Sequence, residues 1–210
     1  METQSFTLLE LFRLGGVFMW PLFFFSVATA AIVCERAAYL IYHNLRMDDL
    51  EEKLKVYIQE GKLDEADAWL SGLSRRRMGA RILLVLVRRS SLSEARMEKA
   101  VEAEALGCVN SLENGFNFLT ALGSLSPLTG FLGTVSGMIG AFKSIAEASE
   151  VNARIVANGI YEALITTVFG LVIAIAAMIF HSVFSHVVDR FAAETEKTCS
   201  NLITEMALRP

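Results

Sequence analysis

Three long runs of apolar residues dominate the pattern of the chain, at residues 15–34, 116–142 and 155–184. A helix needs about 20 apolar residues to cross the hydrocarbon core of a bilayer, and each run is long enough. Glu35 and Arg36 end the first run, as is typical where a membrane helix reaches water. The pattern therefore predicts three transmembrane helices. No basic segment precedes the first run, so we expect an uncleaved anchor and not a signal peptide.

Between the first and second runs, apolar residues recur at the spacing of amphipathic helices. One such helix is predicted from Asp48 to a stop at Gly61, and a second over residues 63–73. The apolar segment 82–87 is too short to span a bilayer and is expected to pack against neighbouring helices. This part of the chain is therefore predicted to form a small helical bundle.

The helical spacing then continues directly into the second apolar run. Because no proline occurs before Pro127, we expect one helix from Leu92 to Phe142, opened by a capping box of Ser91 and Glu94. The third run is expected to continue as a helix through residues 185–202. The predicted fold class is an all-α integral membrane protein with three transmembrane helices, the second and third extended into a cytoplasmic helical bundle.

Composition and charge agree with a membrane protein and set its expected orientation. The 210 residues are 53% hydrophobic, and a net charge of −4 argues against nucleic-acid binding. Most lysines and arginines lie between Arg36 and Lys99, so the positive-inside rule places this segment in the cytoplasm. The resulting expectation is an extracytoplasmic segment 1–14, a first span 15–35, a cytoplasmic helical domain 36–115, a second span 116–142, an extracytoplasmic link 143–154, a third span 155–184 and a cytoplasmic C-terminal helix 185–210.

The chain carries no motif for catalysis, phosphate binding or a resident metal. We therefore expect no enzyme activity, no metal site and no cofactor. Its three cysteines are scattered and predict no disulfide framework. His181 and His186 fall where the third span leaves the membrane, and two interpretations stay open. They either snorkel at the interface or take part in proton exit.

Small residues recur along the second span in two stripes, and they also recur in the third span at Gly159 and Gly170. Small side chains let helix backbones approach closely in lipid. Two stripes imply neighbours on both sides, more than a three-span monomer supplies, so we expect an oligomeric ring. The first stripe comprises Gly123, Pro127, Gly130, Thr134, Gly137 and Ala141, and the second Gly133, Ser136 and Gly140.

Glu162 is the one charged residue in the apolar segment 159–180. A carboxylate in hydrocarbon is costly and usually faces a bundle interior or an ion pathway. Snorkelling to the outer headgroups is the simpler alternative for Glu162. However, Thr166 lies one turn away on the same face, beside Thr167, and the second span carries Thr134. Together these residues are typical of the wall of a polar lumen.

At these residues the chain resembles the MotA/TolQ/ExbB family of proton-channel motor proteins. The resemblance rests on "SPLTGFLGTVSGMIGAF" at 126–142 and "ANGIYEALITTVFGLVIAI" at 157–175, and more weakly on the first span. Three spans with the N-terminus outside resemble the ExbB/TolQ branch more than the flagellar branch.

The resemblance implies a homopentamer in the bacterial inner membrane around a dimeric, single-span partner like ExbD or TolR. Proton flow would drive relative rotation, and a TonB- or TolA-like transducer would pass the work to an envelope process such as TonB-dependent transport. By motif position, the family's pore-lining threonines fall on Thr134 and Thr167, and its membrane glutamate on Glu162. Thr166 departs from the pattern, in which a small apolar residue is usual.

Two other classes remain as alternatives. A secondary transporter would need more spans and preferably inverted repeats. A non-conducting membrane scaffold would not need Glu162 or the threonines. The sequence does not say which envelope process is driven, or whether the coupling ion is H⁺ or Na⁺.

Overall fold

A computed structural model describes residues 15–147 and 153–207, apart from the side chains of residues 153–156, 158 and 162. Every regular element in these ranges is a helix, and no strand occurs in them. Three helical stretches are long and apolar enough to cross a membrane. They are Met19–Tyr42, Glu94–Glu147 and Gly159–Ala207. The predicted all-α class with three candidate spans is therefore confirmed.

The chain divides into two compact units, each built from more than one stretch of sequence. The first unit combines residues up to Cys34 with Gly115–Ser182, and the second combines Glu35–Asn114 with the residues from Val183 onward. Helix α2 (Met19–Tyr42) and helix α8 (Ala153–Ala207) each contribute to both units. The prediction that the third span continues as one helix beyond the apolar run is thus confirmed.

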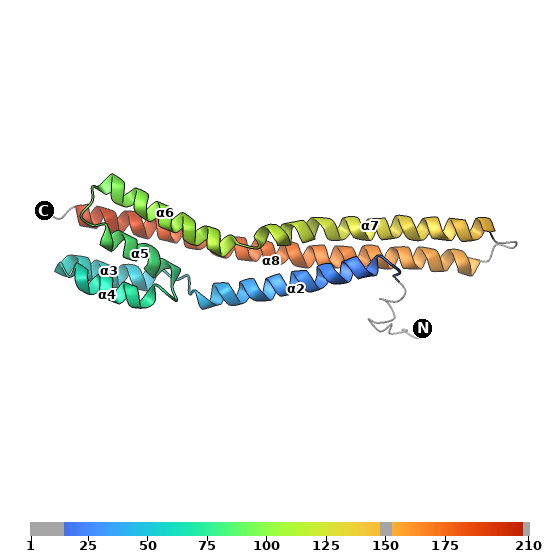
Figure 1. Cartoon of the computed structure of the whole chain (residues 1–210), viewed down its shortest axis with the longest axis horizontal. Coiled ribbons are helices and arrows are strands. Elements are labelled where there is room, and N and C mark those ends of the chain that lie inside the picture. Colours follow the sequence, from blue (N-terminus) through green and yellow to red (C-terminus); the bar gives the residue numbers. More distant parts are fainter. Residues whose placement is uncertain (1–14, 148–152, 208–210) are drawn as a thin grey trace. The chain divides into compact units, whose positions relative to one another are not determined.

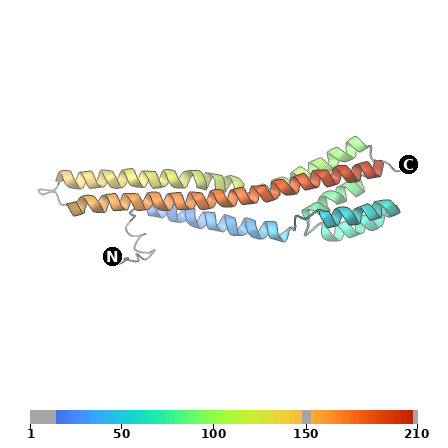
Figure 2. The same ribbon diagram turned by 180° about the vertical axis from the view of Figure 1, so that it is seen from behind.

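The first unit is a helical hairpin with a third helix packed against it. Helix α7 (Phe116–Glu147) and the first part of α8 lie side by side in both views (Figures 1 and 2). The N-terminal part of α2 packs on α8, where Met19 and Leu22 form an apolar cluster with Ile165 and Ile173. Large apolar side chains along α7 and α8 also point outward. Such an apolar surface is expected of a unit that lies in lipid.

The second unit is a bundle of short amphipathic helices. Helix α3 (Asp48–Glu60) starts with three acidic residues, which favour a helix N-terminus, and ends at Gly61 with φ of 74°. The Gly61 and Lys62 amides donate to the carbonyls of Ile58 and Tyr57, a Schellman motif that satisfies the last turn. The predicted stop at Gly61 is confirmed.

The remaining helices of this bundle are α4 (Leu63–Leu73), α5 (Met78–Arg88) and α6 (Glu94–Glu113). Helix α5 packs against both α4 and α6 and buries most of its side chains, as the apolar segment 82–87 predicted. Burial of this segment on two sides makes α5 the core helix of the unit (Figure 1).

A polar contact joins α3 to the C-terminal part of α8 within the same unit. The Glu51 carboxylate accepts hydrogen bonds from Thr198 Oγ1 at 2.9 Å and Asn201 Nδ2 at 3.2 Å, and it pairs with Lys55 at 2.6 Å. The hydrogen bond from Lys55, with those from Thr198 and Asn201, holds the pKa of the Glu51 carboxyl below its ordinary value. Glu51 is therefore bound in its ionised form.

Two sequence expectations about the helix before the second span are wrong. The single helix Leu92–Phe142 is interrupted at Asn114 and Gly115, where Gly115 adopts a φ of 91° that helical residues do not reach. The capping box of Ser91 and Glu94 is also absent, because α6 starts at Glu94 and the N-cap position is Ser93. The boundary between the two units falls at the same break, between Asn114 and Gly115.

Candidate functional site

Glycines bring the backbones of α7 and α8 into direct contact in the first unit. A Cβ atom built on Gly170 would lie 2.5 Å from the carbonyl oxygen of Ser126, and one built on Gly130 would lie 2.8 Å from that of Thr166. Both distances are too short for any larger residue without a backbone shift. The small residues therefore set how closely the two helices approach.

The contact continues along the hairpin on both sides of these positions. A Cβ atom on Gly133 would meet the Thr166 side chain at 2.5 Å, and one on Gly159 would meet the Ala141 side chain at 2.5 Å. A Cβ atom on Gly137 would lie 3.2 Å from the carbonyl oxygen of Gly159. The first small-residue stripe is thus largely used within the chain, to pack α7 on α8.

Three threonine hydroxyls gather at this contact. Thr134 Oγ1 on α7 is hydrogen-bonded to Thr167 Oγ1 on α8, and it also donates to the Ala163 carbonyl at 3.1 Å. Thr166 Oγ1 donates to the Ala163 carbonyl at 2.8 Å. The Gly130 carbonyl lies within 3.2–3.3 Å of all three hydroxyls. The structure therefore brings together all three threonines that the sequence singled out.

The hydroxyl cluster holds more acceptors than donors. Each hydroxyl has one hydrogen to donate and can accept, whereas a carbonyl oxygen only accepts. Thr134 and Thr167 can exchange the roles of donor and acceptor, since each has a carbonyl as its other partner. A pair of this kind can pass a hydrogen-bond orientation from one hydroxyl to the next, which a proton or water relay requires.

The three threonines differ in how far they are covered. Thr166 is only 1% exposed and lies between the helices, whereas Thr134 and Thr167 are half-buried. Only Thr134 and Thr167 therefore present an open side on which water or an ion can approach in the described chain. The expectation that Thr166 lines the pathway stays a prediction, and the structure gives this residue a packing contact.

The other candidate residues are Glu162, whose side chain lies outside the described residues, and His181 and His186, which lie away from this contact. The backbone of Glu162 is part of α8, one turn from Thr166, but its side chain lies outside the described residues. His181 contacts the ring of Phe116 edge-on, with 5.8 Å between ring centroids, and His186 is exposed. Neither interpretation of the two histidines is tested by these positions.

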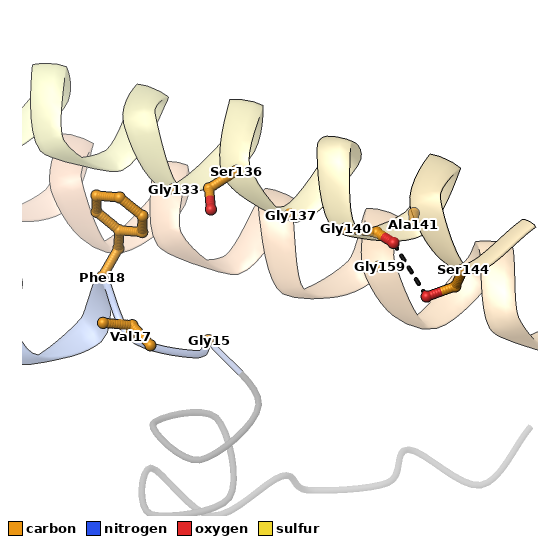
Figure 3. A pocket seen from close by; sticks show the side chains of 10 residues that line it. All are labelled: Gly15, Val17, Phe18, Gly133, Ser136, Gly137, Gly140, Ala141, Ser144 and Gly159. Atoms are coloured by element: carbon orange, nitrogen blue, oxygen red, sulfur yellow. Dashed lines mark hydrogen bonds between the residues drawn. The ribbon is translucent and has the colours of Figure 1, made fainter. Parts of the chain in front are cut away.

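The second small-residue stripe faces a cavity of about 450 Å³. Ser136 and Gly140 line it from α7, and Val17 and Phe18, which precede α2, lie across from them (Figure 3). A Cβ atom on Gly140 would meet nothing within 4 Å. This part of the stripe is therefore not used for packing among the described residues.

Sequence reasoning missed the carbonyl groups that complete the hydroxyl cluster. The Gly130 and Ala163 carbonyls accept from side chains of the facing helix, in addition to their place in a helix. A pattern of side chains carries no direct sign of such a backbone acceptor. The available signal is a glycine or alanine four residues before a threonine, since Gly130 precedes Thr134 and Ala163 precedes Thr167 at this spacing.

Comparison with known proteins decides the family. The model of the MotA/TolQ/ExbB proton channel family matches residues 69–197, more than half of the chain. The chain belongs to this family. Its relatives place it in the ExbB/TolQ-like branch, as the resemblance implied.

Three relatives show how far the similarity extends. The chain is 33% identical to the "Putative biopolymer transport protein ExbB-like 3" of Synechocystis sp. over 188 residues, which is 88% of each chain. It is 28% identical to the "Biopolymer transport protein ExbB" of Salmonella typhimurium over 80% of this chain and 71% of the relative. It is 44% identical to the "Tol-Pal system protein TolQ" of Haemophilus influenzae over 70 residues, 33% of this chain and 31% of the relative.

Proposed function

We propose that this protein is the channel-forming subunit of a proton-driven motor in the bacterial inner membrane. Five copies would form a ring around the single membrane helices of a dimeric ExbD- or TolR-like partner. Proton flow would turn the partner relative to the ring, and a TonB- or TolA-like protein would carry the work to an envelope process such as biopolymer transport. Membership of a proton channel family and the names of the relatives support this proposal.

The single observation that carries the ion pathway is the hydrogen bond between Thr134 and Thr167. It joins two half-buried hydroxyls inside two predicted spans, where hydrocarbon offers no other donors or acceptors. We assign Thr134 and Thr167 to the wall of the pathway. Glu162 is placed toward the start of the third span, and Thr166 between the two helices. The proposed orientation has a periplasmic N-terminus and a cytoplasmic C-terminus.

Support for the ring comes from the small residues that the chain leaves uncovered. Ser136 and Gly140 are exposed beside the cavity, although exposed glycine has no stabilising role in a lone helix. A helix of a neighbouring copy could approach closely at this face. The proposed pentamer therefore uses the first stripe and Gly133 within each subunit, and Ser136 and Gly140 of the second stripe between subunits.

One observation favours a second candidate, a non-conducting scaffold. All three threonine hydroxyls have hydrogen-bond partners at the α7–α8 contact, which packing alone would also produce. Proton flux distinguishes the two functions. The protein is reconstituted into vesicles with its single-span partner, and a pH-sensitive dye inside reports flux under an imposed potential. Flux above that of partner-only vesicles supports the motor, and equal flux with a normal complex supports the scaffold.

A further inference from the structure

The strongest unassigned feature of the second unit is a group of four arginines at the end of α2. Arg46 follows α2 in the loop before α3, and Arg75, Arg76 and Arg77 form the loop between α4 and α5. The two loops are distant in sequence but adjacent in the structure. The guanidinium of Arg77 joins them by donating to the Arg46 carbonyl at 2.6 Å.

Arg77 differs from the other three because its charge is already neutralised. Its two terminal nitrogens donate to the two oxygens of Asp49 at 2.5 and 2.7 Å, a bidentate ion pair. The hydrogen bond and the positive charge of Arg77 hold the pKa of the Asp49 carboxyl below its ordinary value. Arg77 therefore fixes the geometry of the two loops, and Asp49 remains ionised there.

Arg46, Arg75 and Arg76 are exposed, and the structure shows no ion pair for them among the described residues. The carboxylates that follow Arg46 in the chain are Asp48 and Asp49, the first two residues of α3, and Asp49 pairs with Arg77. Four arginines against two carboxylates leave this surface with a net charge of about +2. We call Arg46, Arg75 and Arg76 the arginine patch.

The position of the arginine patch relative to a bilayer follows from α2 itself. The apolar run ends at Cys34, and α2 continues to Tyr42, about 12 Å further at 1.5 Å per residue. The guanidinium of Arg76 stacks on the ring of Tyr42, 5.7 Å from its centroid. Tyrosine is typical of the membrane–water interface. The headgroup layer itself extends about 5–7 Å beyond the hydrocarbon core, so the end of α2 lies about 5–7 Å beyond the headgroups, which is less than the Debye length of about 8 Å at physiological salt. The patch thus lies within electrostatic reach of the headgroups.

We propose that the arginine patch binds the phosphate headgroup of an anionic phospholipid in the leaflet where α2 ends. Guanidinium groups form bidentate hydrogen bonds with phosphate, and basic clusters directly after a membrane helix bind anionic lipids. The bound headgroup would tie the α2–α3 and α4–α5 loops to the membrane surface. This binding is independent of proton flow and needs no partner protein.

The test is a lipid titration of the full-length protein in detergent, followed by native mass spectrometry. The probes are cardiolipin, phosphatidylglycerol, phosphatidylcholine and inorganic phosphate. We expect the two anionic lipids to bind at least about tenfold more tightly than phosphatidylcholine. Arg76→Gln should weaken anionic-lipid binding about fivefold, and replacing all three patch arginines by glutamine about 100-fold.

Arg89→Gln is the matched control. Arg89 is also exposed, and Arg89→Gln removes the same charge as Arg76→Gln. However, Arg89 follows the C-terminal end of α5, whereas Arg76 precedes its N-terminal end. Its lipid affinity should stay within about twofold of the unchanged protein, since the charge lies far from α2. Equal affinity for phosphatidylcholine, or an equal loss in Arg76→Gln and Arg89→Gln, would overturn the proposal. If inorganic phosphate binds as tightly as the anionic lipids, the arginine patch is a site for free anions and the lipid proposal is wrong.

Discussion

Thr134 and Thr167 are hydrogen-bonded to each other through their side-chain hydroxyls, one from each helix of the α7–α8 hairpin. Both also reach the Gly130 carbonyl, at 3.2 and 3.3 Å. The pair forms because the two helices approach closely at Gly130, where a Cβ atom would collide with the facing backbone of Thr166. The polar pair and the glycine packing are therefore one local arrangement, and substitutions can separate their roles.

Removing one hydroxyl of the pair should reduce proton flux and preserve assembly. Valine matches threonine in shape, so Thr167→Val and Thr134→Val keep the packing but delete a donor and acceptor from a site with few substitutes. We expect at least a tenfold loss of flux in reconstituted vesicles, with normal yield of the complex. The matched control is Thr129→Val. The Thr129 hydroxyl only donates to Leu125 of its own helix at 2.9 Å, so its removal should leave flux unchanged.

Glu162→Gln tests the carboxylate near these threonines. Glutamine keeps the size of the side chain and removes its charge. If the carboxylate organises the entrance of the pathway, flux should fall and motor output in cells should fall with it. A silent substitution, with normal expression, would instead identify Glu162 as a residue that snorkels to the headgroups.

Wild-type flux in Thr134→Val, Thr167→Val and Glu162→Gln alike would favour the scaffold. The same set of proteins should then be checked for intact rings, because a scaffold predicts full assembly in all three. A motor predicts full assembly with lost flux. The two readouts together therefore decide between the two candidate functions.

Glycines of the hairpin should fall into two classes when replaced. Gly170→Ala places a Cβ atom 2.5 Å from the Ser126 carbonyl, a backbone atom that cannot move aside, and should destabilise the protein by about 1–3 kcal/mol. Gly140→Ala meets nothing within 4 Å and should leave the thermal midpoint of the single chain unchanged or raised. Circular dichroism in mild detergent measures both.

A larger side chain at Gly140 tests the proposed contact between copies. Gly140→Leu should keep the fold of the single chain but weaken the ring, which native mass spectrometry resolves. Intact rings in Gly140→Leu would contradict the assignment of Ser136 and Gly140 to the subunit interface. Gly170→Ala serves as the opposite case, in which the fold weakens first.

Much of this architecture follows from the sequence because apolar length and helical spacing report burial directly. The three runs predicted the three candidate spans, and Gly61 predicted the end of α3. The break at Gly115 was missed because the apolar spacing continues across it, with Leu112 and Phe116 both buried on either side. Periodicity records which residues are buried, and it does not register a turn that leaves the spacing intact.

The candidate site was predictable as a set of residues but not as an arrangement. Thr134, Thr166 and Thr167 stand out as hydroxyls in apolar spans, yet their order of burial depends on how the two helices are rotated. That rotation is set by backbone contacts at Gly130, which one span's sequence does not reveal. The two small-residue stripes predict neighbouring helices on both sides of the second span, but most of the first stripe packs within the chain.

The Glu51 contact predicts a dependence of stability on acid. The Lys55 hydrogen bond, with those from Thr198 and Asn201, lowers the folded pKa of Glu51 below the ordinary value of 4.5. The stabilisation is therefore fully present above pH 4.5 and is lost as the pH falls through the folded pKa. Glu51→Gln should lower the melting temperature at pH 7, and the difference from the unchanged protein should shrink below pH 4.5.

Glu52→Gln is the control for this titration. Glu52 follows on the same helix and is exposed, so its replacement changes the charge of α3 without touching α8. Its melting temperature should follow that of the unchanged protein at both pH values. A pH-independent difference between Glu51→Gln and the unchanged protein would show that the Glu51 charge does not hold α3 to α8.

The break between α6 and α7 predicts opposite effects for the same substitution at two glycines. Gly115 has a φ of 91°, so Gly115→Ala forces a Cβ atom into a backbone conformation that costs about 1–2 kcal/mol. Gly107 lies within α6, exposed and with nothing within 4 Å of an added Cβ atom. Gly107→Ala should therefore stabilise α6 by about 0.5–1 kcal/mol through its higher helix propensity. Thermal melts in detergent should show a lower midpoint for Gly115→Ala and a higher one for Gly107→Ala. A rise in both would mean that Gly115 is helical and that α6 and α7 form one continuous helix.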